Sequence, residues 1–214
     1  ATPEIYTLSL HDALPIFSIG DAPKFEIVSR LPGEITDDDL RLSAVVLLND
    51  VEVSPSLAKR LARYVDQGGG MFVATGPRAT WPQEVDALPA TIGPPVDRSR
   101  GDAARVGGLE YGHPVFEPFR APRSGDFSAI PVSGYRNLTA AKDARVLARF
   151  DAGTPAVLER RLGRGRILQW SSSLDLAWSD FPTKPVFPVF VHQAAKHLAG
   201  YSEPAPWLAV GQVL

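Results

Sequence analysis

Three residues near the C-terminal end of the chain have side chains that could act together in catalysis. Ser171, Asp175 and His192 follow the last predicted strand, and a nucleophilic triad uses these three residue types. The sequence contains no G-x-S-x-G elbow, however, so the serine lacks the sharp turn that exposes a nucleophile. On a helical wheel His192 lies opposite the apolar stripe of its helix, which favours a surface position. Hydrolysis by Ser171 or Ser173 is therefore the least favoured of the functions considered.

Cysteine is absent from the chain, and its absence excludes several kinds of chemistry together. Thiol nucleophiles, disulfides, iron–sulfur clusters and cysteine-ligated zinc all need that side chain. His113, His192 and His197 stand at no clean metal-ligand spacing from one another or from a carboxylate. His192 and His197 are five positions apart, whereas residues that share a helix face are three or four apart. We therefore expect solvated or capping histidines, no metal, no cofactor and no catalytic residue.

The glycine-rich segments do not indicate a phosphate-binding loop. Gly68-Gly69-Gly70 follows a predicted helix and precedes a strand, whereas a phosphate loop lies between a strand and the start of a helix. Gly163 and Gly165 lack the third glycine and the helix of a dinucleotide-binding pattern. We interpret these glycines as helix caps and turn residues.

Polar residues follow three predicted strands, over residues 43–48, 71–75 and 166–170. In open α/β sheets, ligands bind at the carboxyl ends of the strands. This location makes a speculative ligand-binding set of Asn49, Asp50, Arg78, Ser171 and Asp175. The alternative, which we favour, is that Asn49 and Asp50 cap a strand end and that Arg78 is solvated.

The elements that must position these residues begin with a β-α-β unit. A strand pattern at residues 25–31 precedes this unit. The unit itself consists of the continuously apolar run at 43–48, as in a strand buried on both faces, a helix, and a second strand of the buried type at 71–75. Ser54-Pro55 then opens a helix as cap and first residue, and the glycine triplet ends it. The apolar stripe of this helix is Leu57, Leu61, Tyr64 and Val65.

Residues 78–112 are predicted to form a long loop-rich segment with one short helix. The C-terminal half that follows has the pattern of an antiparallel sheet. Short strands are predicted at 145–150, 156–162 and 166–170, and a final helix at 185–198. Its stripe is Phe187, Phe190, Val191, Ala194 and Leu198. The aromatic residues around it would line a sugar or peptide groove or, as we favour, anchor the helix on the sheet: Trp170, Trp178, Phe181, Phe187 and Phe190.

Composition sets further limits on function. The chain has 214 residues, of which 44% are hydrophobic and 21% charged, and a formal net charge of -2. This near balance lacks the basic footprint of a nucleic-acid-binding domain. No apolar run reaches the roughly 18 residues that a membrane-spanning helix needs, so no direct membrane insertion is expected.

Both ends of the chain are set apart from the expected domain at 17–200. Residues 4–16 read EIYTLSLHDALPI, which resembles the in-frame translation of a common short-read sequencing adapter, and Met71 is the only methionine. We interpret residues 1–16 as an artefact and give His11 and Asp12 no function. Residues 201–214 are proline-containing and read as a linker into a further domain.

Two stretches resemble the amidotransferase-like region of bacterial membrane proteins of the aerotolerance-regulator (BatA) type. They are LNDVEVSPSLAKRLARYVDQGGGMFVATGPR and VLARFDAGTPAVLERRLGRGRILQWSSSLDLAWSDFPTKPVFPVFVHQAAKHLAG. The resemblance implies an α/β fold: a flavodoxin-like, class I glutamine amidotransferase-like sandwich with a mainly parallel sheet and an antiparallel C-terminal extension. It also implies a periplasmic part of a membrane protein whose partners are other domains of its chain and envelope proteins.

The amidotransferase activity does not follow from the resemblance. A true amidotransferase of this fold places a cysteine nucleophile on a strand-to-helix elbow with histidine and glutamate partners, whereas this chain has no cysteine and its strand runs into Gly76-Pro77. We therefore expect no enzyme but a structural or interaction module. The alternatives are a carbohydrate- or small-ligand-binding domain that uses Asn49, Arg78, Asp175 and the Trp178 region and, less favoured, the serine hydrolase.

Overall fold

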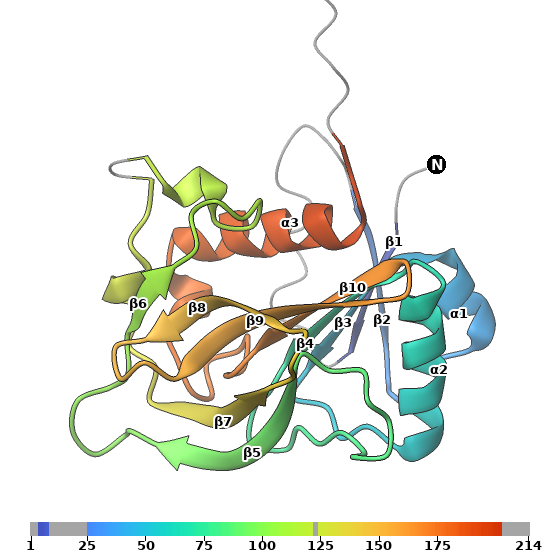
Figure 1. The fold of residues 1–214 in the computed structure, drawn as a ribbon, viewed down its shortest axis with the longest axis horizontal. Helices are drawn as coiled ribbons and strands as arrows, with labels where there is room; N and C mark the ends of the chain where they lie inside the picture. The colour runs from blue at the N-terminus through green and yellow to red at the C-terminus, as the bar shows by residue number, and fades with distance from the viewer. Residues whose placement is uncertain (1–3, 9–24, 122–123, 203–214) are drawn as a thin grey trace, which may run out of the picture.

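A mixed sheet of eight strands runs through the computed structural model, which describes residues 4–8, 25–121 and 124–202 (Figure 1). Its strand order is β2-β1-β3-β4-β10-β9-β8-β6, with the first five strands parallel and the last three antiparallel. The sheet thus has the predicted mainly parallel part and antiparallel extension. The bounds in sheet order are β2 Glu26–Arg30, β1 Glu4–Leu8, β3 Ser43–Asn49, β4 Gly70–Ala74, β10 Gly165–Trp170, β9 Pro155–Leu162, β8 Arg145–Phe150 and β6 Val106–Leu109.

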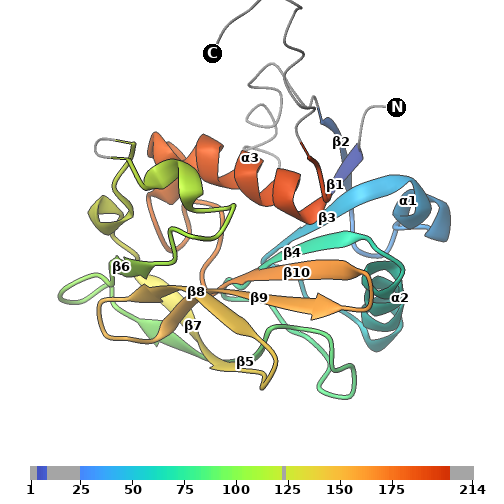
Figure 2. The same cartoon turned by 45° about the horizontal axis from the view of Figure 1, so that its top comes forward.

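Helices cover both faces of this sheet, as Figures 1 and 2 show. α1 (Asp37–Leu42) and α2 (Pro55–Asp66) lie on one face, and α3 (Val186–Leu198) lies on the other. The continuous apolar run of β3 follows from this arrangement, because successive side chains point to opposite faces. Val45 and Leu47 join the core under α3, whereas Val46 and Leu48 join the core under α2.

Helix α2 forms for the local reasons that the sequence predicts. The Ser54 hydroxyl accepts a hydrogen bond from the backbone N–H of Leu57 at 3.3 Å, and Pro55 is the first helical residue. All four predicted stripe residues are buried: Leu57, Leu61, Tyr64 and Val65. Beyond the helix end, Gly68 has a φ of 115°, a conformation that side chains disfavour.

Short helix α1 is not among the elements predicted from the sequence. Thr36 and Asp39 form a reciprocal capping box at its start, each side chain binding the backbone N–H of the other. The helix has only six residues, and its place depends on distant contacts. Leu40 is buried in the core under α2, and Asp37 pairs with Arg60 of α2. A periodicity argument cannot detect so short an element.

The segment over residues 78–112 contains strands instead of the predicted short helix. β6 joins the main sheet, and β5 (Ala90–Asp97) pairs with β7 (Gly134–Ala140) in a separate two-stranded antiparallel sheet. β5 includes Gly93, Pro94 and Pro95 and changes register between Ile92 and Pro95. Its formation therefore depends on its partner strand, because proline and glycine lower the strand propensity of the segment itself.

Helix α3 is anchored by aromatic rings, as predicted, and its whole expected stripe is buried. Phe181 contacts Trp170 of β10, with ring centroids 5.7 Å apart, and Phe187 and Phe190 of α3 at 4.9 and 5.5 Å. Trp178 is not part of this cluster, because its indole lies against the backbone of Gly134. These aromatic residues therefore pack in the core under α3 and do not line a groove.

The two ends of the chain are described only in part. Residues 4–8 form β1, which pairs in parallel with β2 and β3; residues 1–3, 9–24 and 203–214 lie outside the described residues. The adapter and linker interpretations remain predictions, because backbone pairing says nothing about the origin of the codons. In the described part of the chain, no helix has the length and apolarity that a bilayer crossing requires.

Candidate functional site

The predicted edge at the carboxyl ends of the strands contains polar side chains that bind one another. The Asn49 amide donates to a carboxylate oxygen of Asp175 at 3.1 Å, and its carbonyl accepts from the backbone N–H of Leu174 at 2.8 Å. The Ser173 hydroxyl donates to the other Asp175 oxygen at 2.7 Å. Asn49 and Asp175 thus hold the end of β3 to the loop that follows β10.

Asp50 and Arg78 form the second pair at this edge. The buried Asp50 carboxylate accepts from the backbone N–H groups of Arg78 and Ala79 at 2.7 and 2.9 Å, and from the Arg78 guanidinium at 3.0 Å. Asp50 has a φ of 54°, the one left-handed residue other than glycine in the described chain. Aspartate tolerates this conformation better than most residues. The pair closes the turn after β4 onto the end of β3.

The imagined serine triad does not form. Ser171 is fully buried, and its hydroxyl has no hydrogen-bond partner. Asp175 is bound by Ser173 and Asn49, so it does not act on Ser171. His192, expected at the surface, is half-buried, with its ring 5.6 Å from that of Phe25. Ser171 thus lacks both the exposure and the base that a nucleophile needs.

The end of β4 has no room for a nucleophile's side chain. β4 leads into a turn at Gly76 and not into a helix. A Cβ atom at Gly76 would lie 2.5 Å from Cγ of Asp50, and that carboxylate is fixed by two backbone N–H groups. The strand-to-helix elbow of an amidotransferase is therefore absent at this position.

The contact at Gly76 gives a first testable prediction. Gly76→Ala should lower the free energy of unfolding by about 1–3 kcal/mol, because the added methyl group overpacks a fixed carboxylate. Gly33→Ala is the matched control, since nothing lies within 4 Å of a Cβ built there, and it should change stability by less than about 0.5 kcal/mol. Equal urea midpoints for the two variants would show that Asp50 yields freely.

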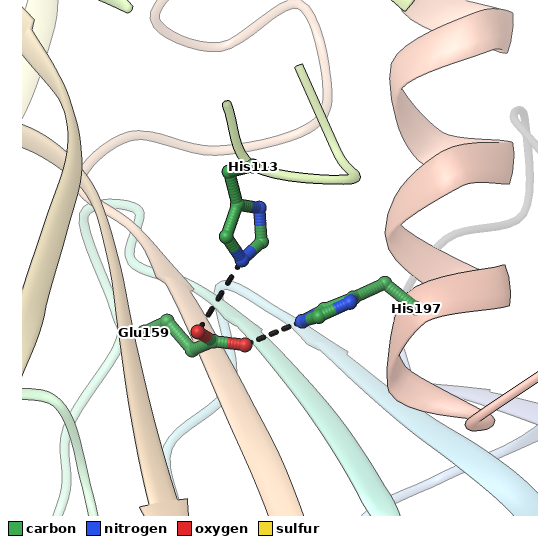
Figure 3. A group of neighbouring side chains, drawn as sticks. All are labelled: His113, Glu159 and His197. Atoms are coloured by element: carbon green, nitrogen blue, oxygen red, sulfur yellow. Dashed lines mark hydrogen bonds and ion pairs between the residues drawn. The ribbon is translucent and has the colours of Figure 1, made fainter. Parts of the chain in front are cut away.

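A different group of titratable side chains meets beside α3. His113 comes from the turn after β6, Glu159 from β9 and His197 from the last turn of α3 (Figure 3). Nε2 of His113 lies 3.3 Å from one oxygen of Glu159, and Nε2 of His197 lies 2.5 Å from the other. The two imidazole centroids are 4.6 Å apart. The three side chains therefore converge on one point.

Hydrogen bonding keeps the Glu159 carboxylate charged despite its burial. Its side chain is 12% exposed, and this burial by itself would raise its pKa. Hydrogen bonds from His113 and His197, together with the electrostatic attraction of these rings, outweigh the burial, so the pKa of Glu159 falls well below its usual range. His113 is only 2% exposed. The expectation of solvated histidines is therefore wrong for His113 and His197, whose side chains are 3% and 12% exposed.

The tautomer of His113 follows from a backbone contact. The N–H of Val115 donates to Nδ1 of His113 at 3.3 Å, so the neutral ring carries its proton on Nε2, directed at Glu159. The carbonyl of His113 accepts from the N–H groups of Phe116 and Glu117 at 2.9 and 2.8 Å, which fixes the turn. The ring is thus positioned from both sides.

Basic side chains surround this cluster in a cleft of about 570 Å³. Arg161 of β9 and Arg166 of β10 are direct cross-strand partners, and both line the cleft with Arg145 and Lys196. Arg145 is paired with Glu110, and Arg166 donates to the carbonyl of His197 at 3.1 Å. In the described residues, no carboxylate forms an ion pair with Arg161 or Arg166. The cleft is therefore electropositive, and the carboxylate of Glu159 within it is bound by the two histidines.

The cleft lies at the opposite end of the parallel strands from the predicted edge. Arg166 pairs with Gly70 at the beginning of β10 and β4, whereas Ser171 and Gly76 lie just beyond their ends. None of the residues predicted to bind a ligand lines the cleft. Two features of the sequence could have indicated the cleft. Glu159 shares a strand face with the buried Val157, and His197 follows Phe190 by seven positions, next to the apolar stripe of the helix.

Comparison with known proteins identifies the fold. No protein-family model and no curated protein matches the sequence. Among solved structures, the cytoplasmic protein STM3548 from Salmonella typhimurium aligns with a TM-score of 0.72 and 15% identity over 92% of this chain and 98% of that one. The cytoplasmic protein STM1381 from Salmonella typhimurium LT2 aligns with a TM-score of 0.70 and 16% identity over 91% and 99% of the two chains. A protein described as ThuA-like from Bacteroides uniformis aligns with a TM-score of 0.61 and 14% identity over 92% and 90%.

These similarities confirm the predicted flavodoxin-like, class I glutamine amidotransferase-like fold and correct two expectations. The resemblance to aerotolerance-regulator proteins is wrong, because the similar structures include ThuA-like proteins, a distinct family. The periplasmic location in a membrane protein is wrong as well, because two of the similar structures are named cytoplasmic proteins. The motifs behind the resemblance serve the fold: a Cβ at Gly165, for example, would lie 2.2 Å from the carbonyl of Gly69.

Proposed function

We propose that this chain is a non-catalytic binding module of amidotransferase-like fold whose cleft beside α3 holds a small anion with phosphate or carboxylate groups. The observation that carries the proposal is the facing pair Arg161 and Arg166. Like charges directly opposite in a sheet destabilise it, and neither guanidinium is offset by a carboxylate ion pair in the described residues. An anion between them removes that repulsion.

The chemistry of the cleft suits such a ligand. Guanidinium groups bind phosphate and carboxylate oxygens through two parallel N–H bonds. Lys196 adds positive charge to the lining, Arg145 is already paired with Glu110, and the histidine N–H groups compensate Glu159. An anion entering the cleft therefore meets donors, and Glu159, the one carboxylate among the described residues that line it, has its own partners.

The non-catalytic part of the proposal rests on the other end of the sheet. The chain has no cysteine, Gly76 has no space for a side chain, and the polar groups of Asn49, Asp50 and Asp175 bind other protein groups. Purified protein should therefore release no ammonia from glutamine above a buffer blank. Turnover that persists after further purification would overturn this part.

The arginine pair gives a prediction in which binding and stability move in opposite directions. Arg161→Ala should weaken the binding of inorganic pyrophosphate by roughly 10-fold or more, because a hydrogen-bonded charge contributes about 1.5–3 kcal/mol. The same change should raise the free energy of unfolding by about 0.2–1 kcal/mol, because it removes the facing charge. Calorimetric titration at constant ionic strength and urea unfolding measure the two effects.

Arg164→Ala is the matched control for this experiment. Arg164 belongs to the same hairpin, but its guanidinium donates to the carbonyl of Gln67 and does not line the cleft. Its replacement should leave pyrophosphate affinity unchanged within about twofold, as expected for a residue that contributes only to the general charge of the surface. An equal loss of pyrophosphate affinity in both variants would overturn the proposal, because it would show that the anion is attracted only by the general charge of the surface. Citrate in place of pyrophosphate separates carboxylate from phosphate ligands.

A further inference from the structure

We infer that His113, Glu159 and His197 form a binding site for a divalent transition-metal ion, with Zn²⁺ the ion of best fit. Each residue offers one ligand atom, and the three atoms lie within 4.8 Å of one another. Tetrahedral zinc with imidazole and carboxylate ligands places those atoms about 3.4 Å apart. Small side-chain movements therefore suffice to close the site.

The donor set matches zinc chemistry. Two imidazoles and one carboxylate are ligands that zinc takes in sites with three protein ligands, in which the fourth position stays open. Calcium and magnesium prefer oxygen donors, so two of the three donors here disfavour them. All three residues line the cleft, so the fourth position faces the space between the basic side chains. Metal binding by the cluster does not depend on the proposed anion.

The three ligands come from separate and well-packed elements. Glu159 lies on a central strand between β10 and β8, His197 on a helix anchored by the aromatic cluster, and His113 on a turn held by backbone hydrogen bonds. Ligands on rigid elements are already ordered before the ion arrives, which lowers the entropy lost on binding. A buried carboxylate that faces two imidazoles is likewise a group for which a cation is a strong partner.

Metal binding must change one contact, and that contact provides a local signal. Nδ1 of His113 accepts from the N–H of Val115 at 3.3 Å, so Nε2 of the neutral ring carries the proton. A metal ion on Nε2 needs the other neutral tautomer, so one proton leaves Nε2 for solvent and one proton from solvent is taken up at Nδ1. The N–H of Val115 loses its acceptor, so its amide resonance must shift when the ion binds.

The test is a titration of the whole chain, purified without a polyhistidine tag and treated with a chelator, with Zn²⁺ alone. We expect one ion per chain, a shift of the Val115 amide, and Co²⁺ absorption of the tetrahedral type when Co²⁺ replaces Zn²⁺. His197→Ala and Glu159→Gln should each weaken Zn²⁺ binding by about 100-fold or more, since the loss of even an outer partner of a zinc ligand costs about 10–100-fold.

The control is His192→Ala, which removes a histidine from the same helix without touching the cluster, and it should bind Zn²⁺ as the unsubstituted chain does. Equal binding by His197→Ala and His192→Ala would overturn the inference, as would Zn²⁺ binding that leaves the Val115 amide unmoved. If a ligand variant fails to fold, the Val115 signal in the unsubstituted chain still decides. Because the titration contains no phosphate, its failure is separate from failure of the anion proposal.

Discussion

Replacing Phe190 by alanine is expected to lower the free energy of unfolding by about 3–5 kcal/mol. The Phe190 ring is fully buried at the middle of the core under α3. It contacts aromatic rings from four other parts of the chain, with centroid distances between 5.5 and 6.0 Å: Phe72, Phe116, Phe127 and Phe181. None of these rings can fill the space alone, because each is held by further neighbours, so a cavity remains.

The adjacent residue gives the control for this prediction. Val189 is 41% exposed on the outer side of α3, and Val189→Ala should change stability by less than about 0.5 kcal/mol. Urea unfolding followed by tryptophan fluorescence measures both variants. A loss below about 1.5 kcal/mol for Phe190→Ala would mean that the aromatic cluster relaxes around the gap, and that α3 is anchored elsewhere.

Asp50→Ala is expected to lower the free energy of unfolding by about 2–4 kcal/mol, although the residue lies in a turn. The change leaves the backbone N–H groups of Arg78 and Ala79 without their acceptor, at about 1–3 kcal/mol for each donor that stays buried. It also places alanine at a φ of 54°, which costs about 1 kcal/mol more.

Two further variants separate the causes of this loss. Asp50→Asn keeps one acceptor oxygen and a side chain that tolerates the left-handed conformation, so about 1 kcal/mol should be lost. Arg78→Ala removes only the ion pair of a side chain that is 71% exposed, and should cost less than about 1 kcal/mol. If Arg78→Ala proved as damaging as Asp50→Ala, the ion pair and not the backbone contacts would hold the turn.

Local signals made much of the parallel part of the fold predictable. Strand β3 is predictable because a strand that is buried on both faces has a continuous apolar run. Helix α2 is predictable from its serine cap, its first-turn proline and its apolar stripe. Strand β5 is different, because Pro94 and Pro95 argue against a strand in isolation. It forms beside β7, and the N–H of Ala90 finds its acceptor in the Gln169 side chain of β10. Such contacts depend on the completed fold and leave no local pattern.

The candidate cleft was harder to predict for the same reason. His113 and Glu159 are 46 positions apart, and Glu159 and His197 are 38 apart, so no spacing rule links them. Glu159 shares a face of β9 with the buried Val157, and a buried carboxylate needs a partner. The identity of that partner required the antiparallel pairing of β9 with β10 and the position of α3. At the opposite edge, the ends of the predicted strands placed Asn49, Asp50, Arg78 and Asp175 in one set. The pairs Asn49 with Asp175 and Asp50 with Arg78 are visible only in the structure.

The most direct test of the account is to map which end of the sheet binds an anion, by recording backbone amide spectra during a titration with inorganic pyrophosphate at constant ionic strength. We expect the shifts to gather at Glu159, Arg161, Arg166 and His113, and to be lost in Arg161→Ala but not in Arg164→Ala. Shifts that gather instead at Asn49, Gly76 and Asp175 would contradict the account, because they would place the binding site at the carboxyl ends of the strands.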